Sequence, residues 1–469
     1  MTRASRRQFL KRSLAGAAGV IALPAIVPSS VLGADAPSNR IHVAQIGCGR
    51  IANDMDLPGI IGNSRDPLRS RKRDIARVVA LCDVDSKRLA QTKAKVEKLY
   101  GDGVAVRTFG DYRQLLQAAD IDAVAVSTPD FWHSELVVAA ALAGKDVYVQ
   151  KPLSMTVHEG RQVSDTVTSQ KRAFQIGSQQ RSDSPWPQFR RACELVRNGR
   201  LGRLHTVRIG LPTDPAGGDP TPMPVPPNLN YPMWLGDTPD APYTLDRVHP
   251  QDSLTGRPGW LRIESYCLGM ITAWGSHHVD IAHWGMNTEL TGPIEAEGKA
   301  VFPTGGLWNV HGAYHVEMKY ANGVTMMIDN NFPNGVRFEG EEGWIFVSRG
   351  AASVTASDPK TGNSEGFAAS TPSILKSEIK PGEIHLHKSS DHHLDWLESI
   401  RTRRPAATTP EIAHRSTSAC EVAWIAMKLG RKLRWDPEKE KFVGDEEADA
   451  LLCRPQRAPY GTDNVLKGV

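Results

Sequence analysis

Short apolar, β-branched runs that alternate with helical stretches constrain this fold most. Four such runs follow Asn39, at residues 41–46, 77–82, 123–127 and 146–149. Apolar residues recur at helical spacing between them, in 86–100 and 133–143. This arrangement is typical of a parallel sheet with helices on both faces. We therefore expect an α/β Rossmann domain, with a doubly wound parallel sheet, over residues 37–155.

The first of these runs leads into the glycine turn Gly47-Cys-Gly49-Arg-Ile-Ala52, which should open a helix. Glycines in this context let the backbone approach a pyrophosphate at the helix N-terminus. Alanine at the third position is small enough for the helix to pack on the strand. The turn predicts a dinucleotide site that includes Gly47, Gly49, Arg50 and Ile51. An ordinary strand-to-helix turn is the alternative.

Asp83 follows the second run and is placed to accept hydrogen bonds from the adenosine ribose hydroxyls. A carboxylate there favours NAD, because it would repel the 2′-phosphate of NADP. The separation from Gly47 exceeds the usual ~20 residues, and the excess is a basic insert at 65–73. Together with Lys87 and Arg88, this insert could instead attract a 2′-phosphate. NAD is the predicted cofactor, with NADP as the alternative.

Beyond Pro152 the pattern changes to that of an α+β domain. Helical spacing at 157–170 and 188–198 is followed by an alternating strand, and then by a Pro/Gly/Asp-rich stretch at 212–258. Such a stretch is too long for a plain connector and indicates an active-site loop system. Three later alternating segments predict a large open, mainly antiparallel sheet. We assign residues 156–469 to a substrate-binding and oligomerisation domain that ends in helices and a tail.

The N-terminus carries a twin-arginine pattern, in which Arg6 and Arg7 precede an apolar stretch at 14–27. This pattern predicts a folded-protein export signal over residues 1–36 and a periplasmic or extracytoplasmic location. The apolar stretch is shorter than the ~20 residues that span a bilayer, which makes a permanent anchor the weaker alternative. No later stretch is apolar enough to span a membrane.

Removal of the signal also changes the charge of the chain. Residues 1–36 hold five basic residues and one acidic residue, so the net charge of +4 falls to zero in the mature protein. A near-neutral chain carries no electrostatic footprint for nucleic acid. We therefore expect a small-molecule partner.

Five motifs, in this order along the chain, carry a resemblance to a known family. They are the glycine turn, Cys82-Asp-Val-Asp85, Ser127-Thr-Pro-Asp-Phe-Trp-His133, Gln150-Lys-Pro-Leu153 and Gly275-Ser-His-His-Val-Asp-Ile-Ala-His-Trp284. The chain thereby resembles the glucose-fructose oxidoreductase, inositol dehydrogenase and MocA family. Residues 411–416 and 434–437 are similar to its exported members. The resemblance implies cofactor contacts from Ser127, Thr128, Pro129, His133 and Lys151.

The resemblance also implies that Lys151 lies beside the nicotinamide and the substrate hydroxyl. An ammonium there polarises the C–OH group and stabilises alkoxide character as hydride leaves. Family members more often have Glu before this lysine, whereas this chain has Gln150. With less negative charge nearby, the amine should release its proton more readily unless another acid replaces that Glu. A surface lysine before a loop proline is the alternative.

His277 matches the family position that acts as general base or acid, a role that suits imidazole. A helical register places Asp280 and Trp284 on the same face. We expect Asp280 to take part in the chemistry, to orient His277 or to stabilise the structure. Many family members carry Asp four residues before this histidine, where this chain has Ala273. A second proton-relay group is therefore missing, which argues against efficient dehydrogenation of free sugars.

Arg181, Trp234 and Tyr266 are candidates for substrate contact, because arginine and aromatic faces suit a polyhydroxylated ring. Packing is the alternative role of each. The histidine pairs do not combine a helical H-x-x-x-H with a placed carboxylate, so we predict no metal site.

Together these residues predict an exported NAD(P)-dependent oxidoreductase that acts on a sugar, cyclitol or glycoside hydroxyl, in a homo-oligomer (dimer or tetramer). Free NAD is scarce outside the cytoplasm, so export in the folded state fits a tightly held cofactor. A trapped cofactor must be regenerated in place. The alternative is therefore a redox-neutral enzyme for glycoside cleavage, epimerisation or sugar-to-sugar hydride transfer. A non-catalytic sugar-binding protein is the third possibility.

Overall fold

The computed structural model describes residues 40–62, 75–101, 105–350 and 366–468. Residues 41–469 form one compact unit. The predicted signal peptide and the basic insert at 65–73 lie outside the described residues. No helix within the described ranges is long and apolar enough to cross a membrane.

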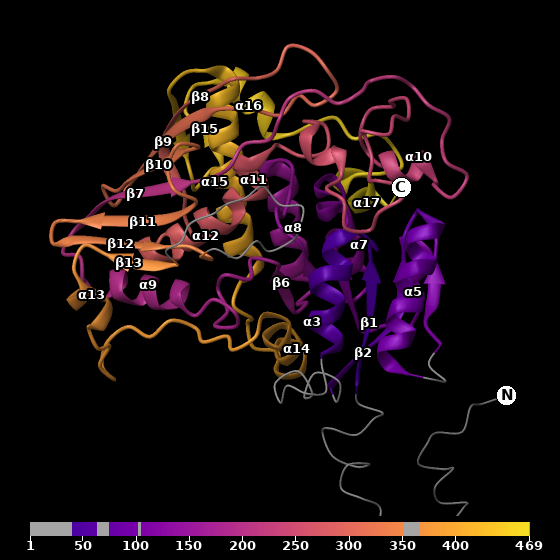
Figure 1. The fold of residues 1–469 in the computed structure, drawn as a ribbon, viewed down its shortest axis with the longest axis horizontal. Helices are drawn as coiled ribbons and strands as arrows, with labels where there is room; N and C mark the ends of the chain where they lie inside the picture. Colours follow the sequence, from indigo (N-terminus) through magenta and orange to yellow (C-terminus); the bar gives the residue numbers. More distant parts are fainter. Residues whose placement is uncertain (1–39, 63–74, 102–104, 351–365, 469) are drawn as a thin grey trace, which may run out of the picture. The chain divides into compact units, whose positions relative to one another are not determined.

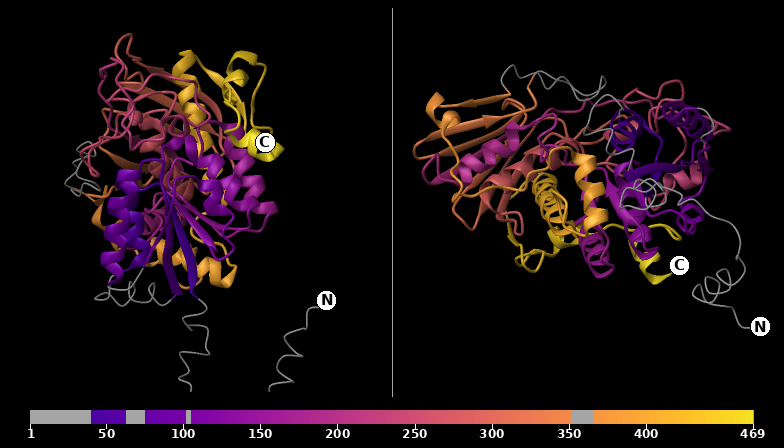
Figure 2. Two further views of the ribbon diagram at one scale, coloured as in Figure 1. Left: turned by 90° about the vertical axis from the view of Figure 1, so that its right-hand side faces the viewer. Right: turned by 90° about the horizontal axis from the view of Figure 1, so that it is seen from below.

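A six-stranded parallel sheet forms the first layer (Figure 1), with strand order β3-β2-β1-β4-β5-β6. Helices stand on both sides of its strands in the left view of Figure 2. This arrangement confirms the predicted Rossmann fold. The strands are β1 (Ile41–Ile46), β2 (Ala76–Cys82), β3 (Arg107–Phe109), β4 (Ala123–Val126), β5 (Asp146–Val149) and β6 (Phe174–Ile176).

The helices of this layer start at recognisable caps. Asp85 begins α5 because its side chain accepts hydrogen bonds from the backbone N–H groups of Lys87 and Arg88. Thr156 caps α8 in the same way. The helical segments are η2 (Ala52–Asp56), α3 (Leu57–Ile61), α5 (Ser86–Tyr100), α6 (Tyr112–Leu116), η3 (Asp130–Trp132), α7 (His133–Leu142) and α8 (Val157–Ser169).

The parallel sheet extends past residue 155, where we had placed the end of the Rossmann domain. After the crossover helix α8, the short strand β6 pairs in parallel with β5. A fully buried strand of three residues carries little sequence signal of its own. The sheet therefore continues to Ile176.

A nine-stranded sheet forms the second part, in the order β13-β12-β11-β7-β10-β9-β8-β14-β15. Its pairs are antiparallel except for β7 with β10, which confirms a mainly antiparallel sheet. The strands are β7 (Leu204–Gly210), β8 (Pro293–Ala300), β9 (Tyr314–Tyr320), β10 (Thr325–Asp329), β11 (Gly335–Gly340), β12 (Gly343–Val347), β13 (Phe367–Ala369), β14 (Leu433–Asp436) and β15 (Lys441–Phe442).

Helices cover one face of this sheet. Burial alternates along β9, as expected for a sheet with one face packed and one face open. The covering helices α9 (Gln188–Arg197), α12 (Gly275–Met286) and α15 (Pro410–Leu429) all contact its strands. The other helical segments are α10 (Tyr231–Leu235), η4 (Gly259–Arg262), α11 (Met270–Ala273), α13 (Pro372–Lys376), α14 (His392–Thr402), α16 (Glu446–Asp449), η5 (Ala450–Leu452) and α17 (Thr462–Lys467).

The C-terminal part of the chain returns to the Rossmann layer. Helix α14 contacts α3 and β6, and α17 contacts α7. Arg454 anchors the tail through ion pairs of 2.7 Å to Glu159 and to Asp237. The tail therefore holds the helices that surround the carboxyl ends of the parallel strands.

Candidate functional site

A pocket opens at the carboxyl ends of strands β1, β2, β4 and β5, where α/β sheets bind ligands. Its other wall comes from the region that follows β7, from α11 and α12, and from the segment after β12. The predicted loop system at 212–258 contributes Met233, Trp234, His249, Gly256, Arg257 and Pro258 to the lining. Both layers of the fold therefore meet at this pocket.

The glycine turn forms the floor of the pocket. Gly47 has φ of +86°, and a Cβ there would lie 2.6 Å from the carbonyl oxygen of Ser127. A Cβ on Gly49 would meet no described atom within 4 Å, and both glycines line the pocket. A side chain at Gly49 would thus fill open space at the start of the helix, which is where a pyrophosphate binds. The residues present fit a dinucleotide.

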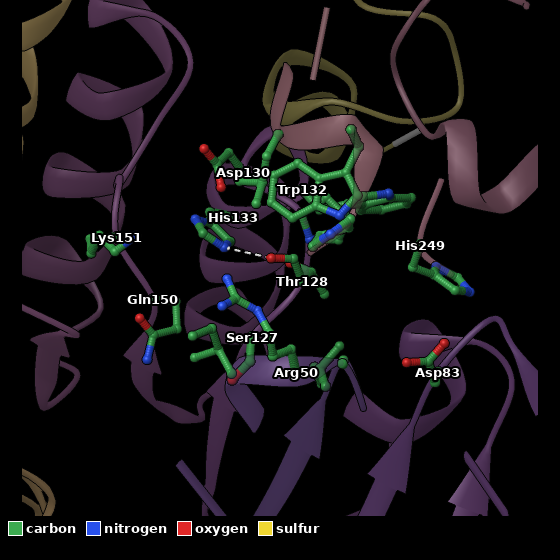
Figure 3. A pocket seen from close by; sticks show the side chains of 18 of the residues that line it. Arg50, Asp83, Ser127, Thr128, Asp130, Trp132, His133, Gln150, Lys151 and His249 are labelled. Carbon is green, nitrogen blue, oxygen red and sulfur yellow. Dashed lines mark hydrogen bonds between the residues drawn. The ribbon is translucent and has the colours of Figure 1, made fainter. Parts of the chain in front are cut away.

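Asp83 lies at one end of the pocket, beside His249 in Figure 3. Its Oδ2 accepts from the backbone N–H of Cys48 at 2.7 Å, and its Oδ1 accepts from that of Asp85 at 2.8 Å. Burial raises the pKa of Asp83. Each carboxylate oxygen keeps a second lone pair for a ribose hydroxyl, so Asp83 both braces the glycine turn and faces the cofactor space.

Lys87 and Arg88 are engaged by the loop after α10. Lys87 Nζ donates to the carbonyl of Gln251 at 2.6 Å, and Arg88 donates to the carbonyls of Pro250 and Ser253 at 2.7 and 2.9 Å. The two described cations that could have bound a 2′-phosphate therefore hold a loop in place. This arrangement favours NAD over NADP.

Lys151 and Gln150 lie at the opposite end of the pocket from Asp83 (Figure 3). Gln150 Nε2 donates to Asp56 Oδ1 at 2.8 Å. The fully buried Asp56 also accepts from Ser127 Oγ at 2.6 Å and interacts with His393 Nε2 at 3.0 Å. A carboxylate thus lies directly behind Gln150. It offsets part of the charge that is lost when Gln replaces Glu at position 150.

His133 fixes the chain that follows Lys151. Its Nδ1 lies 2.6 Å from the carbonyl of Pro152, and its Nε2 lies 3.1 Å from that of Thr128, as the dashed line in Figure 3 marks. Burial lowers the pKa of His133 to about 4, so the ring is neutral and carries one proton. The shorter contact places that proton on Nδ1, which donates to Pro152. His133 therefore connects the Lys151 loop to the loop after β4.

His277 also lines the pocket, from α12, and it lies near enough to Lys151 for the charge of Lys151 to act on its ring. Its Nδ1 lies 3.1 Å from the carbonyl oxygen of Ser178, which can only accept, so Nδ1 carries a proton. Burial lowers the pKa of His277 well below its ordinary value, and the charges of Arg349 and Lys151 act in the same direction. The neutral ring therefore presents an unprotonated Nε2, as a general base requires.

Arg181 and Asp280, which we expected in the site, instead form a buried ion pair outside the pocket lining. Two Arg181 nitrogens lie 2.7 Å from the two carboxylate oxygens of Asp280, and Arg181 also pairs with Glu289. The Arg181 guanidinium lies over the Trp284 ring at 4.8 Å. Asp280 and Trp284 do share one face of α12, but they pack against Arg181, which lies in the loop after β6. Arg181 and Asp280 therefore hold α12 in place.

This ion pair leads to a prediction about stability. We expect Asp280→Asn to lower the free energy of unfolding by about 1.5–3 kcal/mol, because Arg181 is 2% exposed and loses a charge-assisted partner. Urea unfolding measures the change. Glu317→Gln, which alters an exposed ion pair with His315, should change stability by less than ~1 kcal/mol. An Asp280→Asn protein of normal stability but lost turnover would return Asp280 to the chemistry.

The two aromatic candidates for substrate contact, Trp234 and Tyr266, differ in their position relative to the pocket. Trp234 lines the pocket. Tyr266 is 1% exposed, does not line it, and packs on Phe131 and Trp234 with ring centroids 5.1 and 5.2 Å away. Its hydroxyl accepts from Arg247 at 3.1 Å. Tyr266 therefore supports the wall of the pocket from outside its lining, the packing role that we gave as the alternative to substrate contact.

The structure also brings residues to the pocket that the sequence did not single out. Arg349 follows β12 and stacks on the rings of Trp186 and Trp274 at 4.3 and 4.8 Å. No motif marks it. Asp130 lies inside the quoted Ser127-to-His133 motif, where its acidic side chain was an available signal. The additional lining residues are Asp130, His249, Arg257, Trp260, Trp274 and Arg349.

Metal-type ligands do not gather in the described part of the chain. No group of three or more His, Cys, Asp or Glu side chains that could hold a metal ion occurs there.

Two segments of the chain match descriptions of one protein family. Residues 41–178 match "Oxidoreductase family, NAD-binding Rossmann fold", and residues 218–462 match "Oxidoreductase family, C-terminal alpha/beta domain". The chain is 24% identical over 360 residues to "Uncharacterized oxidoreductase YrbE" of Bacillus subtilis, which covers 75% of this chain and 89% of that protein. It is 34% identical over 155 residues to the myo-inositol 2-dehydrogenase of Thermotoga maritima, covering 32% and 41%.

Solved structures agree with the fold. The WlbA dehydrogenase of Bordetella pertussis, crystallised with NADH and UDP-GlcNAcA, superposes with a TM-score of 0.58 at 14% identity, covering 85% of this chain and 99% of that chain. The two family matches together span most of the chain, and the pocket fits NAD. The protein therefore belongs to the glucose-fructose oxidoreductase, inositol dehydrogenase and MocA family of NAD-binding oxidoreductases.

Proposed function

We propose that this protein is an exported dehydrogenase that oxidises a hydroxyl group of a sugar, cyclitol or glycoside. One observation carries the proposal: the neutral His277 and the amine of Lys151 line one pocket, whose floor is a dinucleotide turn, and they lie near enough for the charge of Lys151 to act on His277. Bound NAD would supply the hydride acceptor. The glycine turn, Asp83, Ser127, Thr128, Pro129 and His133 would hold it.

His277 and Lys151 have different roles when the reacting hydroxyl loses its proton. Nε2 of His277 takes the proton of the reacting hydroxyl, because its Nδ1 is already protonated and bound to Ser178. The ammonium of Lys151 donates a hydrogen bond to the oxygen and stabilises the negative charge that develops there. Trp234, Trp260 and Trp274 give the pocket apolar faces, which suit the C–H faces of a ring.

The test is turnover with NAD and a panel of sugars, cyclitols and glycosides, followed by the absorbance of NADH. Net formation of NADH supports the proposal. Conversion of a glycoside or sugar by the cofactor-loaded protein, without net NADH, would replace it with the redox-neutral alternative. Binding of a sugar without either reaction would leave a non-catalytic binding protein.

Asp83 should set the cofactor preference. We expect Asp83→Asn to weaken NAD binding by about 10- to 150-fold, the equivalent of ~1.5–3 kcal/mol for a hydrogen bond to a charged group, and to weaken NADP binding less. The amide oxygen can still accept from Cys48. Asp111→Asn, which changes the corresponding acid after β3, is the control. Tighter binding of NADP than NAD by the parent protein would mean that the insert at 65–73 decides the preference.

Export is the second part of the proposal and rests on the twin-arginine pattern. We expect Arg6→Lys together with Arg7→Lys to retain the protein in the cytoplasm, because that route reads the arginine pair. Fractionation of cells that produce the parent and the double variant measures this. Equal periplasmic amounts of both would contradict the assignment.

We further propose that the protein is a homo-oligomer, a dimer or a tetramer, which leaves the cytoplasm with its cofactor bound. Native mass spectrometry of protein purified from the periplasm reports the oligomer, the cofactor and its occupancy in one measurement.

A further inference from the structure

The pocket holds one carboxylate, on Asp130, that has no role in the proposed chemistry. Asp130 starts η3, is 4% exposed and lines the pocket. Its Oδ2 has no hydrogen-bond partner among the described residues. Buried carboxylate oxygens are normally satisfied, because an unmade hydrogen bond to a buried charged group is costly. An unsatisfied oxygen on a residue that lines a ligand pocket therefore points to a ligand that donates a hydrogen bond.

Asp130 lies at the same end of the pocket as Lys151. Only two of the described lining residues carry carboxylates, Asp83 and Asp130. Asp83 lies at the opposite end of the view from Lys151, whereas Asp130 lies above His133, on the side nearer Lys151 (Figure 3). The charges of Asp130 and Lys151 also interact. A group bound by Asp130 would thus be close to the hydroxyl that reacts.

The neighbours of Asp130 restrict what this group can be. Lys151 and Arg257 place positive charge around the carboxylate, and the thiol of Cys267 donates a hydrogen bond to it. These cations would repel a substrate ammonium and leave a neutral O–H as the favoured donor. Burial raises the pKa of Asp130 to about 7, with Lys151 and Arg257 opposing that rise. The ionised form, which accepts best, gains population as the pH rises through that value.

We propose that Asp130 binds a second substrate hydroxyl, near the one that is oxidised. This inference rests on the proposed function and deepens it, because it makes Asp130 a specificity-determining residue. A substrate that lacks the second hydroxyl leaves a buried carboxylate oxygen unpaired and is rejected for that reason.

Binding to the NADH-saturated protein tests this inference, because the reduced cofactor prevents turnover. The probes are glucose, its 2-, 3-, 4- and 6-deoxy derivatives and myo-inositol, titrated by calorimetry. In the parent protein, we expect loss of the hydroxyl that Asp130 binds to weaken affinity by about 10- to 150-fold. In Asp130→Ala, loss of that one hydroxyl should no longer weaken the affinity. Loss of any other hydroxyl should weaken it as much as in the parent protein, so only one affinity penalty disappears. Asp130→Asn keeps an acceptor oxygen and should show an intermediate penalty.

Asp237→Asn is the matched control. Asp237 is 3% exposed, also has one unpartnered oxygen among the described residues, and lies outside the pocket lining. It should leave every ratio between glucose and its deoxy derivatives unchanged. NADH affinity and the unfolding midpoint report whether each variant is folded, and Asp130→Asn serves if Asp130→Ala is not.

The outcomes separate the two proposals. If the parent protein binds neither glucose nor myo-inositol, the proposed action on free sugars and cyclitols fails, and this inference fails with it. If the parent binds them and Asp130→Ala shows the same deoxy penalties as the parent, the inference is wrong while the proposed function stands. Loss of one penalty only in the Asp130 variants supports the inference, and the turnover assay with NAD decides the proposed function separately.

Discussion

Replacement of Lys151 by Met should lower kcat by about 10²- to 10⁴-fold, the range typical of a lost acid–base group, while NADH affinity stays close to that of the parent protein. Met keeps much of the bulk of the lysine stem and removes only the ammonium. The glycine turn is untouched, and so is Asp83, which lies at the other end of the pocket from Lys151 (Figure 3). Steady-state rates on the best substrate of the panel and NADH fluorescence titration measure the two quantities.

The same strand supplies a matched control. Lys145 immediately precedes β5, and Lys151 follows its end. Lys145 is buried and Lys151 is half-buried, and the Nζ of Lys145 donates to the carbonyls of Ala118 and Ile121 at 2.8 Å, away from the pocket. Lys145→Met should lower stability and leave kcat of the folded protein within about a factor of two. Equal loss of kcat in the two variants would mean that Lys151 acts through folding and not through the reaction.

Local chemistry explains which parts of the fold could be predicted from sequence. Strands β1, β2, β4 and β5 of the parallel sheet are mostly apolar and buried, so they stand out without knowledge of their neighbours. Gly47 marks its turn because a positive φ with a backbone oxygen so close excludes a side chain. Strand β3 was missed, since its residues are exposed or half-exposed and form no apolar run. Elements whose signal lies within a few residues were thus predictable.

Partners distant in sequence were not predictable in this way. The helical register of α12 placed His277, Asp280 and Trp284 on one face, but it could not reveal that Arg181, 99 residues from Asp280, lies opposite. The carboxylate behind Gln150 comes from Asp56, which is 94 residues away, and its contact with His393 spans 337 residues. Burial, which sets the charge state of His277 and Asp130, depends on these distant contacts. The residue types of the site could therefore be predicted from sequence, whereas their charge states could be inferred only from the structure.

His277→Gln should lower kcat for oxidation by about 10²- to 10⁴-fold and remove the acid limb of the pH profile of kcat at saturating substrate. The glutamine amide can still donate to the carbonyl of Ser178, so it keeps that anchor, but it does not titrate. In the parent protein the base must be unprotonated. Because burial holds the pKa of His277 well below its ordinary value, kcat at saturating substrate should stay level through pH 6.5 and fall only as the pH drops through that lowered pKa. The pH profile of kcat/KM also contains the ionisation of Asp130, whose pKa is about 7.

The adjacent His278 provides the control for this change. It is equally buried on α12, with Nε2 bound to Asn334 at 2.8 Å, and it does not line the pocket. His278→Gln should preserve both the rate and the acid limb. An acid limb that survives in His277→Gln would assign the proton transfer to another group, and Asp130 would then be the first to test, since burial raises its pKa to about 7 at the same end of the pocket. An acid limb centred near 7 in the parent protein would favour Asp130, whereas one well below 6.5 would favour His277.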